Sequence, residues 1–138
     1  MLSNIGGSVS EMGAVSLYVY NSLVLCEDRD AADSFHRISI VEMKHLGIFG
    51  SLARMLGADP RLWCLRGNRM QYWNPAYNSY FSTRERAIKN ALDGELRAIE
   101  KYSQQARKIS DAYIAQMLER IIMDEQAHVE IFKKLLNG

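Results

Sequence analysis

The chain has 138 residues, enough for one domain with a hydrophobic core, and its 48% apolar and 24% charged residues are typical of a globular protein. A formal net charge of +1 lacks the basic excess of a nucleic-acid-binding domain. No apolar run approaches the roughly 20 residues of a membrane helix, and the N-terminus lacks the pattern of a signal peptide. Cys26 and Cys64 form no CxxC pair, so we expect reduced thiols in a cytoplasmic protein with neither membrane nor nucleic acid as a partner.

Four long helices are expected along the chain. The second should end at Gly57, because a glycine followed by Pro60 is a helix stop signal. The third should open with Ser82 and Glu85, which have the spacing of a capping box, and Asp111 is a good cap for the fourth. The expected helices are 4–27, 31–56, 82–109 and 110–136.

The connection between the second and third helices, 57–81, is 25 residues long and shows no clean period. Such a long connection is unusual in a compact domain unless it crosses along a bundle. The other two connections are short and make their helices antiparallel. We therefore predict an all-α fold of one domain, 1–138: a four-helix bundle with up-down-down-up order and a long crossover. The crossover's aromatic residues would pack on the side of the bundle: Trp63, Tyr72, Trp73, Tyr77, Tyr80 and Phe81.

Acidic residues interrupt the apolar seam of every expected helix. Two helices each carry a Glu and a His three residues apart in mid-seam, a spacing that puts both side chains on one helix face. Each of the other two helices carries one seam Glu. All lie about 17 to 24 Å from the nearer short connection, so they can meet in one layer. The candidate metal ligands are Glu11, Glu42, His45, Glu95, Glu125 and His128.

The two halves of the chain repeat one another. The segment from Glu11 to Tyr18 parallels the segment from Glu95 to Tyr102, and each seam Glu precedes an ExxH Glu by 31 or 30 residues. This pattern indicates a duplicated helical hairpin. Four carboxylates buried together would repel and would each cost several kcal/mol to desolvate, whereas two divalent cations neutralise them. Oxygen and imidazole donors suit iron or manganese, and zinc is possible.

Simpler interpretations remain open. Ser8 and Glu11 would form an ordinary capping box if the first helix began late. Tyr18 and Tyr102 could be plain core residues. Asp124 could be a surface acid, or it could accept the ring proton of His45. The whole site could also be structural, with seam acids that only set the register of an interaction module.

A Glu on each of two helices and an ExxH motif on each of the other two resembles the ferritin-like dimetal carboxylate proteins, and most closely their rubrerythrin-like branch. The resemblance covers about residues 4–136. It implies that Glu42 and Glu125 bridge the metals, and that His45 and His128 cap one metal each. It further implies terminal ligands at Glu11 and Glu95, and second-sphere tyrosines at Tyr18 and Tyr102.

The resemblance also implies a function. We expect a dinuclear oxidoreductase acting on hydrogen peroxide or oxygen, of peroxidase or ferroxidase type. The chain has Ala98 where full rubrerythrins carry a further Glu, and it has no four-cysteine rubredoxin domain, so electrons would come from another protein. The alternatives are a non-catalytic iron-binding or storage protein and a manganese-catalase-like enzyme that disproportionates peroxide. A homodimer is the expected assembly.

Overall fold

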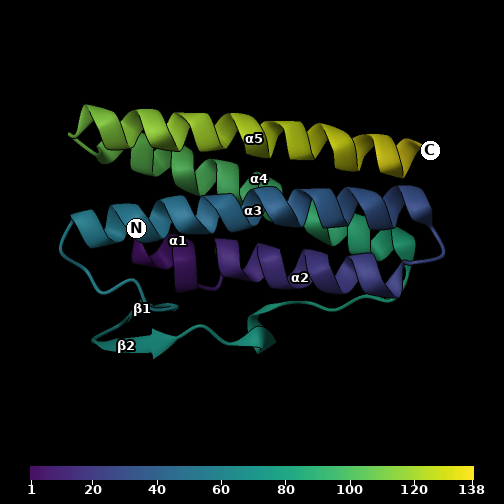
Figure 1. Ribbon diagram of the computed structural model, residues 1–138, viewed down its shortest axis with the longest axis horizontal. Helices are drawn as coiled ribbons and strands as arrows, with labels where there is room; N and C mark the ends of the chain where they lie inside the picture. The colour runs from purple at the N-terminus through teal and green to yellow at the C-terminus, as the bar shows by residue number, and fades with distance from the viewer. The chain divides into compact units, whose positions relative to one another are not determined.

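The computed structural model describes residues 1–138, most of which lie in four long helices (Figure 1). The chain divides into two compact units, Met1–Arg84 and Glu85–Gly138, so each unit holds essentially one of the two predicted helical hairpins. The prediction of a single domain over 1–138 stays a prediction. The helices are α1 (Leu2–Gly6), α2 (Glu11–Val24), α3 (Arg29–Met55), α4 (Arg84–Lys108) and α5 (Ala112–Asn137).

The ends of α3 follow from local chemistry. Its N-cap is Asp28, whose carboxylate accepts a hydrogen bond of 3.1 Å from the backbone nitrogen of Ala31. At the other end, Gly57 has a positive φ of 85°, and the backbone nitrogen of Ala58 donates to the oxygen of Ala53 at 2.9 Å. This is a Schellman motif, in which a residue in the left-handed backbone conformation lets the amide groups that follow the helix donate to its last carbonyl oxygens. The helix end predicted at Gly57 is confirmed.

The first unit buries the seam where α2 packs on α3. Tyr18 and Phe35 are almost fully buried, and their ring centroids lie 5.5 Å apart. Burial of each large apolar side chain contributes roughly 1.5 to 3 kcal/mol to folding. The same seam carries the acidic residues of the candidate site. The apolar residues buried along it include Val15, Ile38, Phe49 and Leu52.

The single first helix predicted over 4–27 is wrong. The short α1 ends at Gly6, an extended segment follows, and α2 begins only at Glu11. Ser10 caps α2 by accepting a hydrogen bond of 3.3 Å from the nitrogen of Gly13. The break has a tertiary cause, since α1 packs closely against the crossover strand that starts at Trp63.

The crossover contains regular structure that the sequence analysis missed. Strands β1 (Trp63–Arg66) and β2 (Arg69–Tyr72) form an antiparallel hairpin, and the 3-10 helix η1 (Pro75–Tyr77) follows (Figure 1). The two-residue turn Gly67–Asn68 joins the strands, with a φ of 62° at Gly67. A Gly-Asn pair between two short segments is a known hairpin signal, so this element was open to prediction.

The second unit is the hairpin of α4 and α5. Asp111 caps α5 by accepting a hydrogen bond of 3.0 Å from the nitrogen of Ile114, as predicted. Helix α4 begins two residues later than Ser82, and Glu85 pairs with Lys89 at 2.6 Å. The buried apolar residues of this unit include Ala87, Ile88, Ala91, Leu118, Ile121 and Phe132. None of the helices in the chain is both long and apolar enough to cross a membrane.

Candidate metal centre

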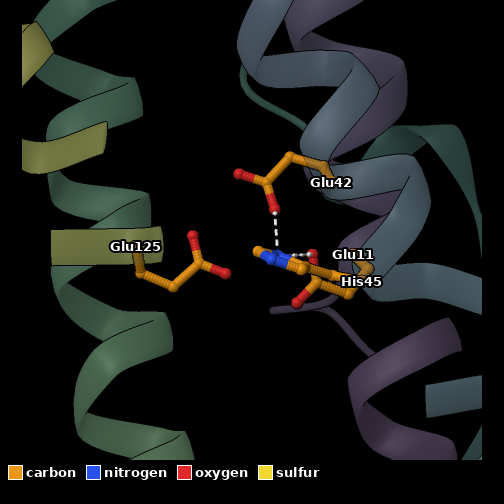
Figure 2. A group of neighbouring side chains, drawn as sticks. All are labelled: Glu11, Glu42, His45 and Glu125. Carbon is orange, nitrogen blue, oxygen red and sulfur yellow. Dashed lines mark hydrogen bonds and ion pairs between the residues drawn. The ribbon is translucent and has the colours of Figure 1, made fainter. Parts of the chain in front are cut away.

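Three predicted ligands of the first unit lie together (Figure 2). Glu42 and His45 project from neighbouring turns of α3, and Glu11 comes from the first turn of α2. The Nδ1 atom of His45 lies 3.2 Å from Oε2 of Glu42 and 3.9 Å from Oε2 of Glu11. One donor atom from each of the three residues falls within 4.8 Å of the others. We call this group the first triad.

Three predicted ligands of the second unit form an equivalent group, the second triad. Glu125 and His128 project from α5, and Glu95 comes from the middle of α4. The Nδ1 atom of His128 lies 3.1 Å from Oε2 of Glu125 and 3.7 Å from Oε2 of Glu95. Their donor atoms also lie within 4.8 Å of one another. In both triads the imidazole therefore turns its Nδ1 atom toward two carboxylates.

The positions of the ligands along the chain explain this equivalence. Asp28 precedes Glu42 by the same number of residues as Asp111 precedes Glu125, so each ExxH motif stands at the same height above its helix cap. The duplicated hairpin inferred from the sequence thus reappears as two triads with matching contacts.

The triads are buried and polar. Their six side chains have exposed fractions between 1% and 4%. With a neutral imidazole, each triad carries two carboxylates and a formal charge of −2. Buried charges are normally paired or bound to metal, because desolvating an isolated carboxylate costs several kcal/mol. One divalent cation per triad would neutralise it. Buried carboxylate oxygens beside an imidazole nitrogen thus fit a cation such as iron or manganese.

Glu11 lies at the start of a helix and is also buried beside His45. It is the first residue of α2, so the capping interpretation was right that this helix begins late, although Ser10 rather than Ser8 is the cap. Glu11 is nonetheless 2% exposed and faces His45. Its carboxylate therefore lies at the positive end of a helix, whereas Glu95 lies well inside α4.

The crossover supports the helix that carries Glu11. The side-chain nitrogen of Asn78 donates a hydrogen bond of 2.9 Å to Oγ of Ser16, one turn along α2. A Cβ built at Gly13 would lie 3.4 Å from Oδ1 of Asn78 and 3.9 Å from Nε1 of Trp73. No sequence pattern signals these contacts, because they join residues about 60 positions apart.

The residues predicted to lie beside the metal ligands differ in their burial. Tyr18 and Tyr102 are buried at 2% and 1% exposure, which suits both a core role and a role beside the carboxylates. Asp124 is partly exposed and pairs with Arg120 one turn away on α5. Its proposed contact with His45 stays a prediction. His36 lies exposed on α3.

Each triad combines one Glu from one helix with the Glu and His of an ExxH motif from another. A helical bundle with two such triads defines the class of ferritin-like dimetal carboxylate proteins. This chain belongs to the rubrerythrin family, whose sequence model matches residues 9–136. It is also similar in fold to two solved structures of KatB, a manganese catalase from Anabaena, one of them of the wild-type protein and one from Anabaena PCC7120. Each match has a TM-score of 0.87 and 22% identity, and covers 99% of this chain and 68% of the other.

These matches confirm the fold class predicted from the sequence, an all-α ferritin-like bundle. At 22% identity the likeness to the catalase shows the fold alone. No curated protein matches the chain.

Proposed function

We propose that this protein is a dinuclear metal carboxylate oxidoreductase that acts on hydrogen peroxide or oxygen. The observation that carries the proposal is the presence of two equivalent, buried triads of two glutamates and one histidine in a member of the rubrerythrin family. In this proposal Glu42 and Glu125, the ExxH glutamates, and Glu11 and Glu95, the seam glutamates of the other two helices, would hold the metals. His45 and His128 would each hold one metal through Nδ1.

The protein groups have defined tasks in this proposal. The metals, when bound, would supply two electrons to the oxidant and stabilise the oxide charge that develops. The apolar seams above and below each triad exclude water and hold the carboxylates in place. Each imidazole turns Nδ1 to within hydrogen-bond distance of a carboxylate, so any proton on that nitrogen would have to leave before Nδ1 could bind a metal.

The first experiment is elemental analysis of protein purified without chelators or a metal-binding tag. We expect about two iron or manganese ions per chain, one for each triad of charge −2. Glu125→Gln and His45→Ala should lower the metal content while far-UV circular dichroism stays helical. Glu119→Gln and His36→Ala are matched controls, because both residues lie exposed on the same two helices and should keep the full metal content. If Glu125→Gln retained two ions per chain, the site would be misassigned.

A manganese-catalase-like activity is the second candidate, and the similarity in fold to KatB favours it. Ala98 stands where full rubrerythrins carry a glutamate, and this departure is a second reason to consider the catalase activity. Oxygen release separates the two functions. A manganese-loaded protein that evolves oxygen from peroxide without an electron donor would be a catalase. An iron-loaded protein that consumes peroxide only with a reductant would be a peroxidase. A protein that takes up iron until its site is full and then shows no turnover would be a storage protein.

The external electron donor, the homodimer and the cytoplasmic location are part of the same proposal. The donor is needed for the peroxidase function because an oxidised centre must be reduced again before each turnover. Their support is the family membership and the composition of the chain.

A further inference from the structure

We propose that the space beside Gly13 on α2 binds one ordered water molecule, which joins this helix to the crossover. Its partners are Trp73 and Asn78 of the crossover and Ser10, the N-cap of α2. All of these residues belong to the first unit. The site includes no metal ligand, and the proposal therefore stands or falls separately from the proposed function.

Neither the backbone nor close packing requires a glycine at position 13. Gly13 lies in the first turn of α2 and has no positive φ, so any residue could adopt its conformation. A Cβ there would meet its nearest neighbours at 3.4 to 3.9 Å, which is ordinary van der Waals contact. Glycine is nonetheless less favourable in a helix than every residue except proline. Use of the space by a bound molecule accounts for its presence.

Three polar atoms surround this space. The Cβ position of Gly13 lies 3.4 Å from Oδ1 of Asn78, 3.6 Å from Oγ of Ser10 and 3.9 Å from Nε1 of Trp73. Both Gly13 and Ser10 are buried. The three atoms offer one N–H donor, one carbonyl acceptor and one hydroxyl group, which can donate or accept. A small molecule beside Gly13 is therefore within reach of both donors and acceptors.

The indole group of Trp73 supplies the main evidence for a bound molecule. Its Nε1 atom is buried, and no protein atom accepts its proton. The amide of Asn78 is held in place because its nitrogen donates to Oγ of Ser16 at 2.9 Å, and its Oδ1 atom faces Gly13. A buried donor without an acceptor costs free energy, since it gives up its hydrogen bond to water on folding. A donor and an acceptor that face one space without contact are the usual partners of a bridging water.

One water molecule satisfies all three atoms. It accepts the indole proton of Trp73 and donates to Oδ1 of Asn78, with Oγ of Ser10 as its third partner. Buried waters in proteins typically make about three hydrogen bonds of this kind. The three groups carry no formal charge, which favours a neutral ligand over an ion. The water links the crossover to the first turn of α2, two residues from Glu11.

A crystal structure of the full chain that resolves ordered water tests the proposal directly. We expect a water oxygen within about 3.2 Å of both Nε1 of Trp73 and Oδ1 of Asn78. The crystal structure of Gly13→Ala should lack this water, because the added methyl group occupies its place. A parent protein without the water, or with a direct hydrogen bond between Trp73 and Asn78, would overturn the proposal. A water that remains in Gly13→Ala would overturn it too.

Nuclear magnetic resonance tests the same site in solution. The indole proton of Trp73 should show a nuclear Overhauser effect to water, with the sign of a water molecule that tumbles with the protein. Gly13→Ala should abolish this effect and leave the indole resonance of Trp63 unchanged, because Nε1 of Trp63 donates to the backbone oxygen of Asp59 at 2.9 Å. Gly47→Ala is the matched control and should keep the effect, since a Cβ at this exposed position of α3 meets nothing within 4 Å. A parent protein without the effect, or a Gly13→Ala protein that keeps it, would refute the water site.

Discussion

Replacing Gly6 by alanine should destabilise the protein by forcing two backbones apart. Gly6 ends α1 where that helix meets the crossover. A Cβ at this position would overlap the backbone nitrogen of Trp63 and would lie 2.6 Å from the carbonyl carbon of Leu62. These atoms belong to the backbone, so no side-chain rotation can relieve the clash. Gly6 has no positive φ, and the requirement for glycine is therefore one of space alone.

The size of the effect follows from these contacts. Carbon atoms pack at roughly 3.5 to 4.0 Å, so α1 or the crossover strand must move by about 1 Å. Overpacking of this kind typically costs about 1 to 3 kcal/mol. Gly47→Ala is the matched control. Gly47 lies exposed inside α3 and a Cβ there meets nothing within 4 Å, so alanine should instead stabilise the helix by about 0.5 to 1 kcal/mol.

Urea unfolding followed by circular dichroism measures both changes, provided that the denaturant slope stays constant. We expect the midpoint to fall for Gly6→Ala and to rise for Gly47→Ala. A Gly6→Ala protein as stable as the parent would show that α1 does not pack tightly on the crossover, and the explanation of the broken first helix would then fail.

Three further predictions concern the metal, the crossover and pH. Removal of metal with a chelator should lower the melting temperature, because free metal at 100 times its dissociation constant contributes about 2.7 kcal/mol of stability; an unchanged melting temperature would favour a structural role for the seam acids. Asn78→Ala should weaken metal binding at the first triad by loosening α2, whereas Asn74→Ala, which affects only the cap of η1, should not; equal losses would refute the positioning role. The backbone amide of Ala31, and then Arg84, hold the pKa of Asp28 below its usual value of 3.8, so Asp28→Ala should cost about 1 kcal/mol at pH 7. A carboxyl group whose pKa is lowered in the folded state stabilises the fold at pH values above its pKa in the unfolded state. The difference in unfolding free energy between the parent and Asp28→Ala should therefore shrink below about pH 4, and a difference that stays constant would contradict this prediction.

The sequence determined most of the helical framework because its signals are local. The caps at Asp28 and Asp111 and the stop at Gly57 act within one or two turns of the chain. The spacing of Glu and His in the two ExxH motifs puts both side chains on one helix face, whatever the helix packs against. Local patterns of this kind were therefore enough to predict the family membership and the two triads.

The rest depended on contacts between distant residues. The break before Glu11 arises because α1 packs on β1. The glycines and serines before Glu11 permit the break, but no local pattern there predicts the contact with β1. The hairpin had a signal in Gly67 and Asn68, but its short strands lack a clean period, so periodicity alone predicts irregular chain across the crossover.

Tertiary structure alone decided three further features. It turned the Nδ1 atom of each imidazole toward the carboxylates, since rotation of a ring depends on what surrounds it. It joined Asn78 to the helix that carries Glu11. It also decided which face of the hairpin points outward, because an alternating pattern defines two faces but only packing determines which of them is buried.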